Sequence, residues 1–312
     1  MYDLTPGARM LLGIAAGDAY GARFENLTVD KAQELMAAEG ISPVAYSDDT
    51  QQSIAVAELM LRAGPLSPVS LADSFLSVYH RNPRHGYSKV TRSMLESSPD
   101  GESFLVSLPE GERDVRKTDG AAMRVVPVGF FPDYGDVIRY SLMSAGITHG
   151  HPDALAATVA VAAIAHERYH NKTPFNGVWS RIRSTVIDVN PDCSEYFDAC
   201  AGLSVLNRGL ILGNYEEYGV PYTESRILLG AVLTLLNLYG DDPERLLLEA
   251  ILLGGDTDTV TALVVGIAVI EYTMTESFFR LITALEDGDY GKGFLIALGD
   301  RLSEKFPSSF RV

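Results

Sequence analysis

Two short acidic segments, far apart in the chain, carry the residues that are best suited to chemistry. Residues 47–50 read Ser-Asp-Asp-Thr, and residues 254–259 read Gly-Gly-Asp-Thr-Asp-Thr. An apolar stretch with helical spacing follows each segment, so each is predicted to begin a helix. Ser, Thr and Asp commonly cap helices, and capping would account for one or two of these residues.

Four carboxylates at two helix starts are more than capping requires. If the two starts converge, Asp48, Asp49, Asp256 and Asp258 could not all stay ionised in one cleft without cations. Oxygen ligands without Cys or His favour a hard ion, Mg²⁺ first and then Mn²⁺ or Ca²⁺. Taken separately, each segment is better explained as a cap. Taken together, the two segments favour a metal site.

A glycine-containing segment near the N-terminus adds a further carboxylate. Residues 17–25 read Gly-Asp-Ala-Tyr-Gly-Ala-Arg-Phe-Glu. The two glycines allow another backbone to approach closely, and Glu25 falls on an expected loop after the helical pattern ends. Glu25 is therefore either a candidate functional residue or a surface residue beyond a helix end.

Two segments in the middle of the chain could contact a substrate. Residues 120–124, Gly-Ala-Ala-Met-Arg, combine small residues whose backbone N–H groups suit a diphosphate, although tight helix packing alone explains them better. Residues 148–152, Thr-His-Gly-His-Pro, place two imidazoles on one turn, where they either line a ribose or adenine subsite or satisfy the turn itself. The candidate binding residues are Gly120, Ala121, Ala122, His149 and His151.

Together, these segments resemble the ADP-ribosylglycohydrolase family. The marks of that family are GDAxGxxxE, an (S/T)DDT helix start, GAAMRxxP, a THxxP turn and GGDTDT, and all five occur here in family order over about residues 7–270. Gly86-Tyr87 also fits a Gly-Tyr-Gly turn of the family, with Ser88 in place of the second glycine. One departure is Thr118-Asp119, where the family often has Gly-Asn. An Asp there is unfavourable beside a diphosphate unless it turns away or meets the ribose hydroxyls.

The resemblance implies an all-helical fold with a central cleft that holds two Mg²⁺ ions, or Mn²⁺ in their place. The matching ligand positions are Ser47, Asp48, Asp49, Asp256, Asp258 and Thr259. Glu25 matches a glutamate that gates the site or positions water, and Asp18 matches an aspartate that supports the metal shell. Either Glu25 or a metal-bound aspartate such as Asp258 is expected to be the catalytic base.

Composition limits the possible partners. The chain has 312 residues and a net charge of −16, from 25 Lys+Arg against 41 Asp+Glu. This charge argues against general nucleic-acid binding and against an anionic membrane surface. Cys193 and Cys200 form no metal-binding pattern, and the longest apolar stretch, Val260–Ile270, is too short to span a bilayer. The N-terminus is a poor signal peptide, so a cytoplasmic location is expected.

The spacing of apolar residues predicts one all-α domain over residues 1–312. No segment is bounded as a good strand, although Val125–Phe131, with Pro127 inside it, is the most strand-like. Residues 97–119 are predicted to be an irregular surface excursion. The predicted helices are Ala8–Tyr20, Asp48–Ala63, Ser67–His80, Tyr134–Ser144, Asp153–His170, Phe175–Val189, Ser194–Leu212, Thr223–Tyr239, Pro243–Leu253, Asp256–Thr275 and Gly291–Phe306. Within Asp153–His170, residues 155–165 are apolar nearly all round, which predicts a deeply buried helix.

A competing motif lies at the end of that helix. Residues 166–170 read His-Glu-Arg-Tyr-His, which matches the HExxH pattern of zinc proteases. No third ligand with a recognisable motif follows, and a zinc site would leave the acidic segments unexplained. A solvated helix end, where His and Arg complement the helix dipole, is the preferred interpretation.

The expected function is Mg²⁺-dependent hydrolysis that removes ADP-ribose from a modified protein or another ADP-ribosylated acceptor. By resemblance, arginine is the favoured acceptor, ahead of serine, a nucleic-acid base or a free metabolite. Two alternatives are a non-catalytic relative with a structural role, as in a lens crystallin of this fold, and a module that binds ADP-ribose without cleaving it.

Overall fold

The computed structural model describes residues 4–38, 45–213 and 223–309. Within these ranges the chain forms α-helices and short 3-10 helices and no strand, and an isolated β-bridge joins Thr118 and Glu224. The prediction of an all-α fold is therefore confirmed. The α-helices are α1 Pro6–Gly21, α2 Val29–Ala38, α3 Asp48–Leu61, α4 Pro68–Arg81, α5 Lys89–Ser97, α6 Gly101–Val106, α7 Glu112–Val115, α8 Tyr134–Gly146, α9 Pro152–His170, α10 Phe175–Val189, α11 Ser194–Ala201, α12 Arg208–Leu212, α14 Ser225–Tyr239, α15 Pro243–Leu253, α16 Thr257–Ala268, α17 Glu276–Ile282 and α18 Lys292–Lys305. The 3-10 helices are η1 Asp119–Ala121, η2 Val126–Phe130, η3 Pro191–Cys193 and η4 Val269–Glu271.

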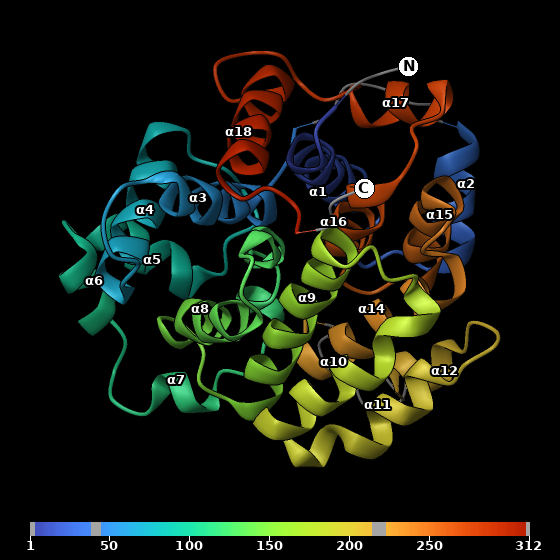
Figure 1. Cartoon of the computed structure of the whole chain (residues 1–312), viewed down its shortest axis with the longest axis horizontal. Helices are drawn as coiled ribbons and strands as arrows, with labels where there is room; N and C mark the ends of the chain where they lie inside the picture. Colours follow the sequence, from blue (N-terminus) through green and yellow to red (C-terminus); the bar gives the residue numbers. More distant parts are fainter. Residues whose placement is uncertain (1–3, 39–44, 214–222, 310–312) are drawn as a thin grey trace.

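The core is built around α1, α9 and α16, which are buried over most of their lengths. Figure 1 shows these three helices in the middle of the molecule, with α4 to α6 on one side and α2 and α15 on the other. Helix α1 packs on α16 and α18, so the beginning of the chain lies against its C-terminal part. The burial of α9 confirms the expectation for residues 155–165, because helices that are apolar all round are stable only when they are covered.

Several predicted helices end earlier than expected. The predicted helix Ser194–Leu212 is wrong, because the chain forms α11, ends it at Gly202 and starts α12 at Asn207, whose side chain accepts from Leu210 N. The predicted helix Asp256–Thr275 becomes α16 and η4, and the chain leaves the helical path at Tyr272. At Asn207 a capping side chain competes with continued helical spacing, and at the end of η4 the Arg9 side chain donates to the Val269 and Ile270 carbonyls.

Other local predictions were wrong in type. The strand-like segment Val125–Phe131 forms η2, in which Pro127 lies near the start, where a missing N–H costs no hydrogen bond. Residues 97–119 contain α6 and α7 rather than only irregular chain. Helices α2, α5 and α17 were not predicted. The side chains of Ser88 and Thr275 cap α5 and α17, and such short helices depend on caps and tertiary contacts.

Across the described ranges, no helix is both long enough and apolar enough to cross a bilayer.

Candidate active site

Helix α1 fixes the position of the second acidic segment. Thr257 Oγ1 donates to the Gly21 carbonyl at 2.7 Å, and Thr261 Oγ1 donates to the Gly17 carbonyl at 2.6 Å. A Cβ at either glycine would collide with backbone atoms of α16. The two glycines thus allow α1 to approach the first turns of α16, and the close contact that they permit is with protein rather than with a ligand.

Asp18 fixes the position of the first acidic segment. Its buried carboxylate accepts from Ser47 N at 2.9 Å, from Thr50 N at 3.0 Å and from Thr50 Oγ1 at 2.6 Å. Ser47 is the N-cap residue of α3, but its side chain makes no capping bond. Asp18, a residue of α1, therefore accepts hydrogen bonds from the backbone N–H groups at the start of α3. Burial raises the pKa of Asp18, although these hydrogen bonds act in the opposite direction.

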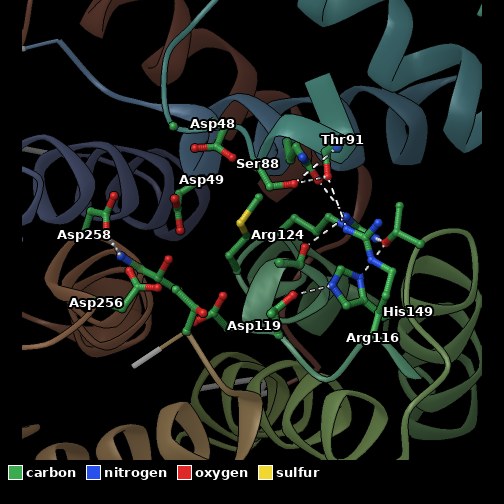
Figure 2. Close-up of a pocket in the computed structure, with 18 of the residues that line it drawn as sticks. Asp48, Asp49, Ser88, Thr91, Arg116, Asp119, Arg124, His149, Asp256 and Asp258 are labelled. Atoms are coloured by element: carbon green, nitrogen blue, oxygen red, sulfur yellow. Dashed lines mark hydrogen bonds between the residues drawn. The ribbon is translucent and has the colours of Figure 1, made fainter. Parts of the chain in front are cut away.

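The two acidic segments meet at one pocket of about 320 Å³. Figure 2 shows Asp48, Asp49, Asp256 and Asp258 on one side of it, and Arg116, Arg124 and His149 on the other. A pocket of this volume is within the usual range for small-molecule sites. The sequence-predicted residues that line it are Glu25, Asp48, Asp49, Gly120, His149, Asp256, Asp258 and Thr259.

Four predicted site residues lie elsewhere. Ser47 is buried below the pocket, and its hydroxyl donates to Asp49 Oδ2 at 3.4 Å. Ala121 and Ala122 are fully buried, and Ala122 N donates to the Asp119 carbonyl at 2.7 Å, so this N–H is already used within the loop. His151 is the N-cap of α9, where its Nδ1 accepts from Asp153 N. The structure thus favours the turn interpretation for His151.

The carboxylates of the pocket repel one another. Burial raises the pKa of Asp49 well above its usual value, and the negative charges of Asp258 and Asp48 raise it further. Burial, followed by Asp256, raises the pKa of Asp258 to about 10. Such a site favours bound protons or cations, since several ionised carboxylates buried close together raise the free energy of the folded protein.

Neither acidic segment behaves as an ordinary helix cap. The N-cap residues Ser47 and Asp256 make no side-chain capping bond. A buried oxygen of Asp49, Oδ1, has no hydrogen-bond partner. Within the ranges that the structure describes, no three His, Cys, Asp or Glu side chains are arranged as a complete ion-binding group. The oxygen donors fit a hard divalent ion in chemistry, and the metal centre stays a prediction.

Gly86 gives Asp48 the space that it occupies. This residue has a φ of 103°, a conformation that favours glycine, and it lines the pocket. A Cβ there would collide with Asp48 Oδ1. The following Tyr87 is buried and donates from its hydroxyl to Gln51 Oε1 at 2.8 Å, which holds the turn against α3.

Asp119 is a fifth aspartate of the pocket that sequence reasoning did not select. It begins η1, is 6% exposed, and lies within hydrogen-bonding reach of Asp256. Burial is the main cause that raises the pKa of Asp119 to about 7. The only signal in the sequence was the departure Thr118-Asp119, where an Asp replaces the more usual Asn.

Two arginines on the opposite wall were also missed. Arg124 is 1% exposed and donates to Gln52 Oε1, the Gly120 carbonyl, the Ser144 side chain and carbonyl, and Thr148 Oγ1. Burial lowers the pKa of Arg124 to about 9. The N–H groups of its guanidinium all donate to protein acceptors, so Arg124 holds the wall together and is not free to bind a ligand. Arg116 lines the same pocket and makes a long hydrogen bond, 3.4 Å, to Thr91 Oγ1.

His149 joins the two loops of this wall. Its Nε2 is 2.8 Å from Thr118 Oγ1, and its Nδ1 is 2.8 Å from Thr148 Oγ1. Burial, with a contribution from Arg124, lowers the pKa of His149 well below 6.5, so the ring is neutral at physiological pH. The imidazole is therefore a neutral element of the pocket wall.

The HExxH motif has a structural role, and its interpretation as a solvated helix end is wrong. His166, Glu167 and His170 are all at most 5% exposed. His166 Nδ1 is 3.0 Å from the Phe131 carbonyl, and His170 Nε2 is 3.0 Å from the Phe130 carbonyl. Glu167 pairs with Arg181 at 2.6 Å. These side chains attach η2 and α10 to the end of α9.

Mg²⁺ is expected to raise the melting temperature of the wild type, because an ion that binds only the folded state stabilises it by mass action. Asp256→Ala should lose most of this rise. Since burial raises the pKa of Asp119 from 3.8 to about 7, the metal-free protein should lose stability as the pH rises between these values, and the stabilising effect of Mg²⁺ should grow over the same range. Melting curves with Mg²⁺ or EDTA at two pH values provide the measurement. An unchanged Mg²⁺ shift in Asp256→Ala would count against the assignment.

Comparisons with known proteins identify the family and the fold of this chain. The sequence profile of the ADP-ribosylglycohydrolase family matches residues 7–307. ADP-ribosylhydrolase ARH3 of Xenopus tropicalis is 28% identical over 299 residues, covering 83% of this chain and 84% of the relative. ADP-ribosylhydrolase ARH3 of Gallus gallus is 24% identical over 303 residues, covering 83% of each. A solved chain of an ADP-ribosylglycohydrolase-related protein complex has a TM-score of 0.60 and 22% identity over 98% of both chains, which shows a shared fold.

The profile match spans nearly the whole chain and includes all five sequence segments that meet around the pocket or support it. The resemblance inferred from those segments, and the prediction that the chain is a hydrolase of this kind, are confirmed. The chain belongs to the ADP-ribosylglycohydrolase family.

Proposed function

We propose that the pocket hydrolyses the bond between C1 of the distal ribose of ADP-ribose and its acceptor, with Mg²⁺ as cofactor. The observation that carries this proposal is the division of one pocket into a carboxylate side and a cationic side (Figure 2). ADP-ribose has matching parts, because its diphosphate is anionic and its distal ribose offers neutral hydroxyls beside the reacting carbon.

The cationic side suits the diphosphate. Arg116 has a guanidinium at the pocket wall, and Gly120 lines the same wall. Arg124 supports this wall from below by holding the Gly120 carbonyl at 2.9 Å. Arginine binds phosphate oxygens with directed, charge-assisted hydrogen bonds. The diphosphate therefore fits between Arg116 and the loop of residues 118–120.

The carboxylate side suits the ribose and the attacking water. Asp48, Asp49, Asp256, Asp258 and Thr259 would hold Mg²⁺ there, and bound Mg²⁺ would lower the pKa of the attacking water. Glu25 lines the pocket but is itself exposed, so it can accept a proton from water and release it to solvent. The bond from C1 to the acceptor breaks through an oxocarbenium-like transition state, and water supplies the new oxygen.

Arginine is the proposed first acceptor. Glu25 is exposed at the pocket and is not one of the proposed Mg²⁺ ligands, so its carboxylate provides a negative field on the side where the acceptor leaves. A guanidinium-containing acceptor carries positive charge and is attracted by this field.

A cytoplasmic location is also part of the proposal. Both cysteines, Cys193 and Cys200, are unpaired and buried, which is typical of proteins from a reducing compartment.

A panel of ADP-ribosylated acceptors tests the function. Peptides carrying ADP-ribosyl-arginine and ADP-ribosyl-serine, and ADP-ribosylated oligonucleotides, are incubated with the protein and either Mg²⁺ or EDTA. We expect release of ADP-ribose with Mg²⁺ only, fastest from arginine. Binding of ADP-ribose without release from any acceptor would support the non-catalytic alternative. Release that EDTA does not affect would contradict the metal requirement.

Arg116→Gln is expected to weaken ADP-ribose binding by about 10- to 100-fold, since a charged hydrogen bond contributes roughly 1.5–3 kcal/mol. Adenosine, which lacks the diphosphate, should bind the variant and the wild type equally. Calorimetry with both ligands provides the measurement. Arg139→Gln is the matched control, because Arg139 is an exposed arginine outside the pocket whose partner is Asp136. Equal weakening of both ligands would show a general disturbance of the pocket rather than a lost diphosphate contact.

A further inference from the structure

The carboxylate of Asp119 lies at the pocket, and one of its oxygens makes no hydrogen bond within the protein. It is 6% exposed and lines the pocket, and its Oδ2 has no hydrogen-bond partner. A buried carboxylate oxygen without a donor is costly, so native proteins retain one where something else satisfies it. Figure 2 shows Asp119 on the same side of the pocket as Asp256.

The backbone of Asp119 is held firmly, which fixes the direction of its side chain. Asp119 N donates to the Thr223 carbonyl at 2.9 Å, and its carbonyl accepts from Ala122 N at 2.7 Å and from Met123 N at 3.1 Å. The preceding residue, Thr118, pairs with Glu224 in the isolated bridge. The loop therefore has its own backbone support and does not depend on the Asp119 carboxylate.

The neighbours of this carboxylate are negative. Asp256 lies within its hydrogen-bonding reach, and the charges of Asp258 and Asp48 also act on it. The proposed diphosphate would add further negative charge on the adjoining loop. A cation between Asp119 and these groups would turn each of the repulsions into an attraction.

We propose that Asp119 is a further ligand of the divalent ion held beside Asp256, so that this ion is bound by more carboxylates than the ion on the Asp48 side. The inference rests on the proposed metal centre and extends it by one residue. More ligand charge raises the affinity of oxygen sites for hard divalent ions. The two ions should consequently differ in affinity, with the tighter one beside Asp119.

The test is a titration of metal-free protein with Mn²⁺, in which the paramagnetic resonance signal reports free Mn²⁺. For the wild type we expect two classes of site. In Asp119→Asn, which changes the charge with almost no change in size, the tighter class should weaken by about 10- to 100-fold. Asp119→Ser should show the same loss, which guards against poor folding of one variant. Asp114→Asn is the matched control, because Asp114 is exposed on the nearby α7, lies outside the pocket and undergoes the same change of charge.

The outcomes separate this inference from the proposal on which it rests. A wild type that binds no Mn²⁺ overturns the metal centre and the role of Asp119 together. A wild type that binds Mn²⁺ in two classes, with both affinities unchanged in the folded Asp119 variants, overturns only the role of Asp119. Equal weakening of both classes, or the same loss in Asp114→Asn, shows a general electrostatic effect and also overturns direct ligation.

Discussion

Asp258→Asn is expected to abolish metal binding and turnover together. Asp258 lies in the first turn of α16 and lines the pocket together with Asp256 and Thr259. Asn keeps the size of the side chain and one carbonyl oxygen, but it removes the negative charge that a hard cation needs. If the metal supplies several kcal/mol of transition-state stabilisation, turnover should fall by about 10³-fold or more.

Mg²⁺ calorimetry and turnover of an ADP-ribosyl-arginine peptide measure the two effects in one preparation. Asp136→Asn is a suitable control, since Asp136 also occupies the first turn of a helix, α8, but its side chain is 40% exposed and lies outside the pocket. The control should retain both properties. If Asp258→Asn bound Mg²⁺ as the wild type does and still lost turnover, Asp258 would be a base rather than a ligand. Normal turnover of Asp258→Asn would show that Asp258 has no role in the reaction.

The acidic side of the pocket could be predicted because its geometry follows from local rules. Both acidic segments begin helices, and small residues in α1 allow α16 to pack closely. The sequence also suggested that Asp18 plays a supporting role, but not that it would cap α3 from another helix. That bond joins residues 18 and 47, which are far apart in sequence. Contacts of this kind depend on how the helices pack.

Arg116, Arg124 and Asp119 could not be predicted as site residues for the same reason, although Gly120 and His149 beside them were predicted. Arg116 and Asp119 lie in a loop whose course is set by the pairing of Thr118 with Glu224 and by the burial of Arg124. No local spacing indicates that bridge. The burial of His166 likewise depends on η2, which supplies carbonyl partners and which the sequence suggested as a strand. Local rules therefore identified which residues are chemically capable, and the tertiary contacts determined which of them face the pocket.

Glu25→Gln is expected to separate chemistry from binding. Glu25 lines the pocket, and its charge contributes to the raised pKa of Asp256 and of Asp258. The next residue, Asn26, has a φ of 60°, which Asn tolerates better than most residues, and its N–H donates to the Gly255 carbonyl at 3.3 Å. This bond holds Glu25 beside the start of α16. The carboxylate is thus near the reacting groups without being one of the predicted metal ligands.

Gln keeps the volume and hydrogen bonding of Glu25 but cannot accept a proton at neutral pH. Turnover should therefore fall by about 10²- to 10⁴-fold if Glu25 is the general base. Mg²⁺ binding and the affinity for ADP-ribose should stay close to those of the wild type, in contrast to Asp258→Asn. Glu34→Gln, on the exposed surface of the neighbouring α2, provides the matched control and should turn over normally. If Glu25→Gln also turned over normally, Glu25 would be a structural loop residue. The proton would then have to pass to a carboxylate inside the pocket, such as the proposed metal ligand Asp258.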